Sequence, residues 1–375
     1  MNGSNPPSQR ALLICATLLI FTLATVGVVF AASSPFITPL NDVDVVSSTV
    51  PTNGDVNPYG VARVPVSTGN LVQGHILISN FNNSANLQGT GTTIVDIATN
   101  GAFHLFAQIN AAKLPGPCPG GVGLTTALVV LRTGWVIVGS LPTTDGTSAT
   151  ASAGCLLVLN SHGHVVETFS GSPINGPWDM TALDAGKLVE LFFTNVLNGT
   201  VAGNGSVVNQ GTVVRFLLSA SKSQMPHLLL STIVGSGFPT RTDPAALVIG
   251  PTGLALDSSA QHLYVADSLS NRIAAISNPA FRLTSAGIGK TISQNGALND
   301  PLGLTLAPNG NLIAANGNNG KLVEVTPGGA QVAKKLVDNT GGPPPGAGTL
   351  FGLIALSGHV YFVDDGSNTL NVLEQ

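Results

Sequence analysis

Three segments in the C-terminal half of the chain repeat one pattern, and this repeat constrains the fold more than any other feature. Each copy reads as a glycine, an apolar run, a tight polar turn, a second apolar run that ends in Asp or Asn, another turn and a third apolar run. The copies are 250–276, 300–325 and 348–373. Their first glycines, Gly253, Gly303 and Gly352, lie about 50 residues apart, a period typical of propeller blades.

Looser copies of the pattern precede these three, which makes six units in all. They are 57–81 with 91–97, 121–141 with 154–160, and 176–196 with 211–218. Most units carry a fourth apolar run downstream, at 102–109, 164–170, 227–234, 290–294 and 330–337. The sixth unit lacks a fourth run, because Gln375 follows directly on its third.

Six units of four strands predict an all-β fold, a six-bladed β-propeller of four-stranded blades. An unpaired edge in the last blade would expose a row of backbone donors and acceptors. Residues 41–50 alternate in part and precede the first unit, so we expect them to complete the last blade. A pair of β-sandwiches would explain neither the period nor the missing strand. The expected division is therefore an N-terminal segment at 1–32, a lead-in at 33–56 that contains the closing strand, and the propeller at 57–375.

The composition agrees with a protein built from short strands. Hydrophobic residues make up 43% of the chain and charged residues only 9%, with 45 Gly and 24 Pro. A helical protein would need more Lys and Glu on its exposed faces, whereas Gly and Pro suit the turns between strands. The net charge is −4, and Lys and Arg form no cluster. We therefore expect no nucleic-acid partner, because neutralisation of phosphates drives that binding.

The N-terminal segment indicates export. Residues 11–32 form an uncharged apolar run after Arg10, and small residues follow at 31–34. This order is typical of a signal peptide that is cleaved after Ala31 or Ala32. The run is also long enough to span a bilayer as a retained anchor, and the sequence leaves both alternatives open. Because Arg10 keeps the N-terminus inside in both cases, we expect a secreted, periplasmic or cell-surface protein.

The stretch "LYVADSLSNRI" (263–273) resembles an NHL repeat. The six-unit chain is similar to exported bacterial proteins of the NHL and six-bladed TolB-like propeller class, over about residues 40–375 and most clearly in the last three units. In that class many members are binding scaffolds, and others are enzymes such as streptogramin lyases, gluconolactonase-like hydrolases and peptide-amidating lyases. The resemblance therefore implies the fold without fixing the function.

A polar residue recurs where the second apolar run of each unit ends. These residues are Asn80, Ser140, Asn195, Asp267, Asn316 and Asp364. A position shared by every blade argues against catalysis, because a single active site needs asymmetry. We expect these short side chains to cap the following turn through its backbone N–H groups. In the hairpin at 262–273, Asn271 suits a left-handed turn position, and Arg272 is expected to lie along the blade surface.

Three histidines also share one position, five residues before the capping residue. They are His75, His262 and His359. Repeated histidines could indicate a ring of metal ligands. However, the position opens the second strand and lies off the ring axis, so these side chains are expected to be too far apart to share one ion. We therefore predict no metal site and no cofactor.

The loops that follow the second runs break the repeat. They are short in the last three units and long in the first three, at 80–91, 140–154 and 195–211. In a propeller these loops emerge on one face, so they predict a polar, Gly-rich rim at the channel mouth, where binding functions concentrate. The ligand-binding residues expected at this rim are Asn80, Asp145, Asn195, Asp267, Asn316 and Asp364. A variable surface with no site is the open alternative.

The two cysteines of the second unit predict a disulfide. Cys118 lies in the loop 113–121, and Cys155 begins the third run. The strand topology of a blade brings both residues to the loop-bearing face. In an exported protein a bond between them is chemically reasonable, and it would fix the long loop 140–154.

No nucleophile elbow, P-loop, HExxH, paired CxxC or EF-hand spacing occurs in the chain. We therefore expect an exported, non-enzymatic propeller that binds an unknown protein or small-molecule ligand at its loop-rich face. The alternative is a lyase or lactonase-like hydrolase with a cation at the channel mouth, for which Asp179, Asp267 and Asp364 are the acidic candidates. A purely structural surface protein also stays open. A membrane is an expected partner only through the N-terminal segment, if it is retained.

Overall fold

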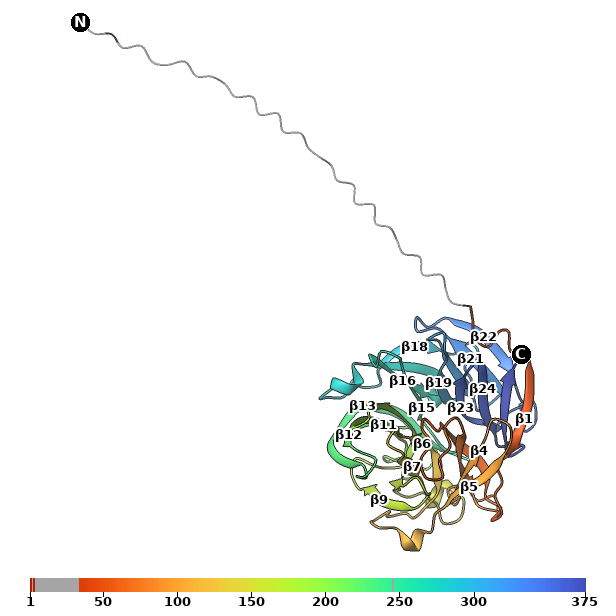
Figure 1. Ribbon diagram of the computed structural model, residues 1–375. Coiled ribbons are helices and arrows are strands. Elements are labelled where there is room, and N and C mark those ends of the chain that lie inside the picture. Colours follow the sequence, from red (N-terminus) through yellow and green to blue (C-terminus); the bar gives the residue numbers. More distant parts are fainter. Residues whose placement is uncertain (2, 4–33, 245) are drawn as a thin grey trace. The chain divides into compact units, whose positions relative to one another are not determined.

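The computed structural model describes residues 1, 3, 34–244 and 246–375. It separates into two units, Met1–Ser33 and Ser34–Gln375. The signal peptide or anchor expected at 11–32 lies outside the described residues. Within the described ranges, no helix is long and apolar enough to cross a membrane. The second unit is a ring of six β-sheets (Figure 1).

Each sheet is one blade, and its strands follow one another from the ring axis outward. The inner strands are β2 (Val56–Arg63), β6 (Leu124–Val130), β10 (Pro177–Asp184), β15 (Pro251–Leu256), β19 (Pro301–Leu306) and β23 (Leu350–Leu356). The second strands are β3 (Ile76–Asn82), β7 (Val136–Ser140), β11 (Leu188–Asn195), β16 (His262–Asp267), β20 (Leu312–Asn316) and β24 (His359–Asp364). The predicted six-bladed β-propeller is confirmed.

The two outer positions of each blade complete the sheet. The third strands are β4 (Thr93–Ile97), β8 (Cys155–Leu159), β12 (Val208–Ser219), β17 (Arg272–Ser277), β21 (Lys321–Val325) and β25 (Thr369–Glu374). The outer strands are β5 (Phe103–Gln108), β9 (Val165–Ser170), β13 (His227–Asp243), β18 (Lys290–Gln294), β22 (Gln331–Leu336) and β1 (Asp42–Ser48). Short 3₁₀ helices lie in the connections: η1 (Ala111–Lys113), η2 (Ser148–Thr150), η3 (Ser268–Ser270) and η4 (Pro279–Phe281). We number the blades 1 to 6 in the order of their inner strands.

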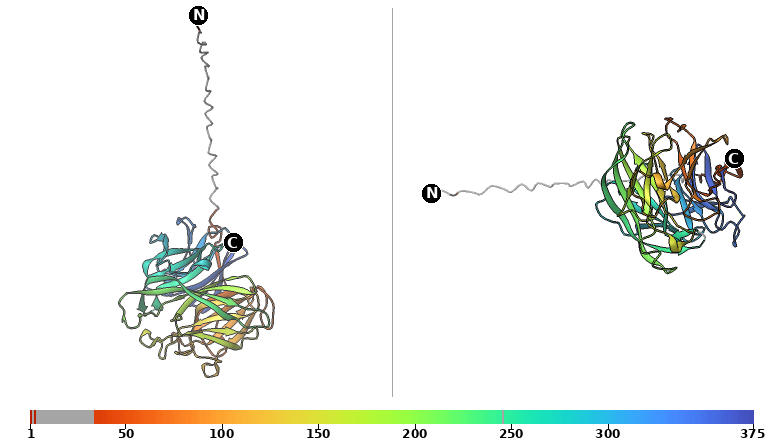
Figure 2. Two further views of the ribbon diagram at one scale, coloured as in Figure 1. Left: turned by 90° about the vertical axis from the view of Figure 1, so that its left-hand side faces the viewer. Right: turned by 90° about the horizontal axis from the view of Figure 1, so that it is seen from below.

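The first strand of the chain closes the ring. β1 runs antiparallel to β25, from Asp42 opposite Glu374 to Ser48 opposite Thr369. Figure 2 shows from two further sides that the red-orange start of the propeller lies beside the blue C-terminal strand. The closing strand expected within 41–50 is therefore present. It pairs the edge of β25 that would otherwise be open.

The place of a strand in its blade explains its sequence. β4 (TIVDI) and β8 (CLLVL) are buried along their whole length, because neighbouring blades cover both faces of the sheet. The outer strand β22 (QVAKKL) instead alternates between half-buried and exposed residues. The apolar cores of the protein thus lie between the blades, and polar residues appear where the outer strands meet solvent.

Glycines allow the inner strands of neighbouring blades to approach closely. A Cβ added at Gly303 would lie 2.0 Å from the carbonyl oxygen of Phe351, and one added at Gly352 would lie 2.2 Å from that of Tyr59. Gly253 meets the backbone of the next blade in the same way. The glycines that mark the repeat are therefore required by the packing of blade against blade.

Hydroxyl groups of three blades donate hydrogen bonds to the inner strand of the next blade. Ser79 Oγ donates to the carbonyl of Thr125 at 2.6 Å. Thr194 Oγ1 donates to the carbonyl of Thr252 at 3.1 Å, and Thr252 Oγ1 donates to that of Pro301 at 3.0 Å. Each bond satisfies an acceptor on the free edge of an inner strand, which has no partner strand on that side.

Blade 3 departs from the repeat. Its outer strand β13 has 17 residues and continues into a hairpin with β14 (Leu247–Ile249). The sequence predicted only the first half of β13, at 227–234. Ala246 and Leu247, at the turn of this hairpin, join a core cluster that also contains Tyr59, Trp178 and Phe351. The hairpin therefore leaves blade 3 and packs against residues of the inner strands.

Candidate functional site

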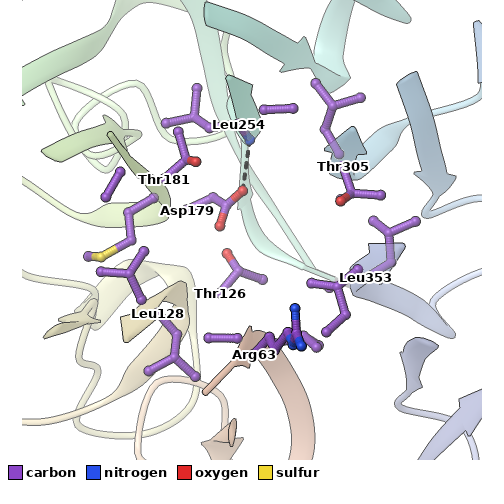
Figure 3. A pocket seen from close by; sticks show the side chains of 18 of the residues that line it. Arg63, Thr126, Leu128, Asp179, Thr181, Leu254, Thr305 and Leu353 are labelled. Carbon is purple, nitrogen blue, oxygen red and sulfur yellow. Dashed lines mark hydrogen bonds between the residues drawn. The ribbon is translucent and has the colours of Figure 1, made fainter. Parts of the chain in front are cut away.

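The inner strands enclose a cavity of about 330 Å³ on the ring axis (Figure 3). All six inner strands contribute to its wall. Each inner strand is the edge of its sheet, so alternate backbone N–H and C=O groups face the cavity instead of a partner strand. The wall therefore combines backbone polar groups with aliphatic side chains such as Leu128 and Leu353.

Aromatic side chains close one end of this channel. Tyr59 stacks on Phe351 with ring centroids 3.9 Å apart and on Phe81 at 4.6 Å, and Trp178 packs edge-on against Tyr59 and Phe81. Leu247 of the β13–β14 hairpin belongs to the same cluster. We call these five residues the plug. None of them is more than 2% exposed, so the channel has no entrance at this end.

The long loops pack over the plug. Leu141 and Ala151 of the loop 140–154, and Leu197 of the loop 195–211, belong to the same core cluster as the plug. The loops 80–91 and 140–154 also contact each other, since the N–H of Thr143 donates to the carbonyl of Gly89 at 2.9 Å. The open channel mouth expected beneath these loops is therefore wrong, because apolar side chains of the loops belong to the cluster that closes this end.

A disulfide joins Cys118 and Cys155, whose Cα atoms are 5.1 Å apart. Cys155 begins β8 directly after the loop 140–154. Cys118 lies in the connection that leads into β6. The bond predicted between these two cysteines is thus present, and it holds the end of a loop that covers the plug.

The other end of the channel is open. Arg63, the last residue of β2, is exposed, and Leu256, Leu306 and Ile354 near the ends of their inner strands are half-buried. The turns that join inner to second strands lie on this face. The cavity therefore opens on the face opposite the three long loops, whereas the sequence placed the site on the loop-rich face.

Asp179 is the acidic side chain deep in this channel (Figure 3). It lies in β10, two residues after Pro177, where the pairing of this inner strand with β11 begins. At this position four other blades have glycine: Gly60, Gly253, Gly303 and Gly352. In blade 2, β6 carries a bulge at this level, and Thr126 lines the channel. Blade 3 thus carries a carboxyl group where the repeat elsewhere has no ionisable group.

The surroundings of Asp179 favour its protonated form. Its Oδ2 accepts a hydrogen bond from the N–H of Leu254 at 2.8 Å. Burial raises the pKa of Asp179 to about 7, and the N–H groups of Leu254 and Met180 offset only part of this effect. Both protonation states are therefore present near neutral pH, which is the condition that a general acid or base needs.

Three threonines add hydroxyl groups to the channel wall. Figure 3 shows Thr126 and Thr181 beside Asp179, and Thr305 on the opposite wall. Thr126 donates a hydrogen bond to the carbonyl of Trp178. The deep part of the channel thus offers a carboxyl group, hydroxyl groups and backbone polar groups beside aliphatic side chains. Such a surface suits a small organic molecule with a few polar atoms.

The residues predicted to bind ligand do not line this cavity. They are Asn80, Asp145, Asn195, Asp267, Asn316 and Asp364. Asp145 is exposed and accepts hydrogen bonds from Thr147 and Thr150 of its own loop. These hydrogen bonds keep the pKa of Asp145 below its usual range. Ligand binding by the six residues stays a prediction.

The capping residues bind a different segment from the one expected. The side-chain amides of Asn80, Asn195 and Asn316 donate to carbonyls of the chain that leads into the inner strand, at Thr49, Pro173 and Ala297. The end of a second strand lies beside the start of its antiparallel neighbour, so the side chain meets the incoming chain first. Capping of the following turn is therefore wrong for these three residues. Asp364 does follow it, since Oδ1 accepts from the N–H of Ser367 at 3.2 Å.

Arg272 is buried, although the sequence placed it along the blade surface. Its Nε and Nη2 donate to Asp267 Oδ2 at 3.0 and 2.7 Å, and Nη1 donates to Thr291 at 3.2 Å. The guanidinium also lies 5.8 Å from the centre of the Phe238 ring. The prediction was wrong because the strand register sets Arg272 directly opposite Asp267. Asn271 has a φ of 48°, as expected for a left-handed turn.

The residues named for metal binding do not converge. Each histidine of the repeated position pairs with a carboxylate: His75 with Asp96, His262 with Asp257 and His359 with Glu374. Within the described part of the chain, no group of three or more His, Cys, Asp or Glu side chains could hold a metal ion. Asp267 is already paired with Arg272, and Asp179 lies beyond the plug. The cation of the enzyme alternative therefore does not fit these residues.

Two further half-buried carboxyl groups were not found from the sequence. Burial raises the pKa of both Asp300 and Asp365 to about 7, and the charges of Asp243 and Asp364, respectively, raise them further. Both residues lie in turns, where an aspartate reads as ordinary turn chemistry. The sequence carries no signal for their burial, because the surrounding surface comes from distant segments.

No protein-family model and no curated protein matches the chain. Solved structures share its fold. A gluconolactonase from Xanthomonas campestris has a TM-score of 0.55 at 12% identity, over 89% of this chain and 90% of that one. A PQQ-bound aldose sugar dehydrogenase from Streptomyces coelicolor has 0.52 at 14% identity, over 88% and 98%. The calcium-binding protein regucalcin from Agrobacterium tumefaciens has 0.52 at 10% identity, over 89% and 93%. At these identities the likeness shows the six-bladed fold alone.

Proposed function

We propose that the chain is an enzyme of the lyase or lactonase-like hydrolase type, which binds a small organic substrate in its central channel and uses Asp179 to transfer a proton. One observation carries this proposal. Asp179 lies deep in a cavity of about 330 Å³ that is open at one end, and its pKa is raised to about 7. Ionisable groups whose pKa is shifted towards neutrality by burial in a cleft are typical of acid–base catalysts.

The geometry gives Asp179 a defined chemical role. The N–H of Leu254 fixes the orientation of the carboxyl group. In hydrolysis, the carboxylate takes a proton from the attacking water and then returns it to the leaving oxygen. In an elimination, it takes a proton from carbon and passes it to the leaving group. Backbone N–H groups on the free edges of the inner strands can stabilise the negative charge that develops on the substrate oxygen.

The fold is compatible with this role. Solved structures with the same fold include a gluconolactonase and an aldose sugar dehydrogenase, so small-molecule enzymes are built on this scaffold. The proposal itself rests on Asp179, since a shared fold does not fix function.

Export and the resemblance to NHL and TolB-like propellers belong to the same proposal. The stretch 263–273 supports the resemblance. The disulfide between Cys118 and Cys155 supports export, because such bonds persist in oxidising compartments.

Ligand binding without reaction is the second candidate function. The loop-rich face carries polar side chains, among them the exposed Asp145, and a protein or small molecule could bind across the covered plug. The closed channel end makes this a surface interaction. The enclosed Asp179 has no role in it, which is why we favour the enzyme.

The test is turnover of a panel of small γ- and δ-lactones, including aldonolactones, followed by proton release. For any lactone that the protein hydrolyses, Asp179→Asn should lower kcat/KM by about 100-fold or more, the usual contribution of a general base. The rate of the unmodified protein should rise with pH through about 7. Asp44→Asn, on the exposed strand β1, is the matched control and should leave the rate unchanged. Hydrolysis that survives Asp179→Asn would rule out this role.

A further inference from the structure

The mouth of the channel carries one arginine, and nothing like it recurs around the ring. Arg63 pairs with Ile76, four residues before the capping residue Asn80. In the other five blades the residue at this register position is apolar: Val130, Ala182, Leu256, Leu306 and Ala355. Only blade 1 therefore carries a charge at this register position, just as only blade 3 carries a carboxyl group at the deeper position of Asp179.

The guanidinium of Arg63 is not used by the fold. It makes no hydrogen bond and no ion pair with any residue in the described ranges. Among the described residues, the nearby carboxylate of Asp184 makes no ion pair with Arg63. Its Oδ2 accepts from the N–H of Arg132 at 2.6 Å, and its Oδ1 accepts from the N–H of Gly186 at 2.7 Å. Arg63 is thus available to a ligand at the channel mouth.

Arg63 and Asp179 are set apart along the channel. Arg63 lies three residues beyond Gly60, which is the counterpart of Asp179 in blade 1. At about 3.3 Å per residue, the two backbone levels are roughly 10 Å apart. The wall between them carries Leu128 and Leu353 together with the hydroxyl groups of Thr181 and Thr305 (Figure 3). A ligand that meets both groups is therefore elongated and uncharged in its middle.

We propose that the channel takes a small organic carboxylate whose anionic end pairs with Arg63 and whose uncharged, reacting end reaches Asp179. This inference rests on the proposed function and deepens it by naming the substrate class. The planar guanidinium suits a carboxylate, because it can donate two parallel hydrogen bonds. The reverse orientation would place two carboxyl groups together in an enclosed site, so the charges also fix which end enters first.

Binding of two unreactive probes to the full chain tests this inference. The probes are 6-hydroxyhexanoate and the matched neutral 1,6-hexanediol, measured by calorimetry at low salt. The carboxylate should bind at least about tenfold more tightly, as expected for a charge-assisted bond. Arg63→Gln should remove this preference and leave the affinity for the diol unchanged. Arg132→Gln, at a neighbouring exposed turn, is the control and should keep the preference.

Several results would overturn the inference. Equal affinity for the two probes, no binding of either, or a preference that survives Arg63→Gln would each do so. Tighter binding of 6-hydroxyhexyl phosphate would replace the carboxylate by a phosphate ester.

The same variants separate this inference from the proposed function. Arg63-dependent binding without Asp179-dependent turnover would leave the inference standing and refute the enzyme. Asp179-dependent turnover that is indifferent to Arg63→Gln, together with equal affinity of the unmodified protein for the two probes, would do the reverse.

Discussion

At the scale of single residues, the candidate site consists of residues that differ from their counterparts in the other blades. Asp179 replaces a glycine that four other blades keep, and Arg63 replaces an apolar residue that all other blades keep. The two side chains come from blades 3 and 1, and they face one channel. Neither blade alone provides both groups, so the candidate site is complete only when the inner strands are assembled.

The glycines that remain in the repeat should tolerate little change. Gly303→Ala would place its Cβ 2.0 Å from the carbonyl oxygen of Phe351, so the two blades must separate. We expect the free energy of unfolding to fall by about 1–3 kcal/mol, the range for overpacked sites. Urea unfolding measures it. Gly328→Ala is the control, since its nearest contact would be 3.7 Å. An equal effect of both changes would contradict the packing argument.

The aligned sequence reveals Asp179 as an exception to the repeat, but it does not reveal the plug. When the units are aligned, "GPWD" at 176–179 stands against "GPTG" at 250–253 and "DPLG" at 300–303, so the exception is visible in the letters. The plug is different. Tyr59, Trp178 and Phe351 read as ordinary core residues, because convergence on the axis depends on the closed ring and not on local pattern.

At the scale of elements, the local sequence pattern predicts the strands of the repeat, whereas an element held by long-range contacts is not predicted. β18 begins and ends where the run 290–294 does, because alternation and turn residues are local signals. The β13–β14 hairpin was missed, since its second half is held by Leu247 packing in the plug. The missed hairpin is thus one of the elements that close the channel at the loop-rich end.

The closing strand should be indispensable. Deletion of residues 41–50 would remove β1 and leave the edge of β25 unpaired. We expect a large drop in melting temperature and association of the protein through the exposed edge. Thermal unfolding and light scattering of the deletion variant measure both effects. The substitution Asp44→Asn keeps the strand and should change neither. Unaltered melting after the deletion would refute closure by β1.

At the scale of the whole molecule, buried carboxyl groups link stability to pH. The pKa of Asp179, Asp300 and Asp365 is raised to about 7 in the folded protein, against about 4 in an unfolded chain. Between these values the folded protein binds more protons than the unfolded chain. Their stabilising effect is therefore complete below about pH 4 and is lost as the pH rises through about 7.

Urea unfolding at pH 5.5 and pH 8 should show this dependence. We expect a lower midpoint at pH 8, because the three carboxyl groups must then ionise in poorly solvated positions. Asp179→Asn should reduce the difference between the two midpoints, since an amide does not ionise. A midpoint that is higher at pH 8 would contradict the direction of these shifts.

The plug leaves ligands one way into the channel and the same way out. With one end sealed by Tyr59, Trp178 and their neighbours, whatever enters past Arg63 must also leave past Arg63. In the proposed enzyme, product and incoming substrate would therefore use the same opening, and we expect the product to inhibit competitively. A molecule longer than the channel can also insert one end past Arg63 while the rest of it remains in solvent.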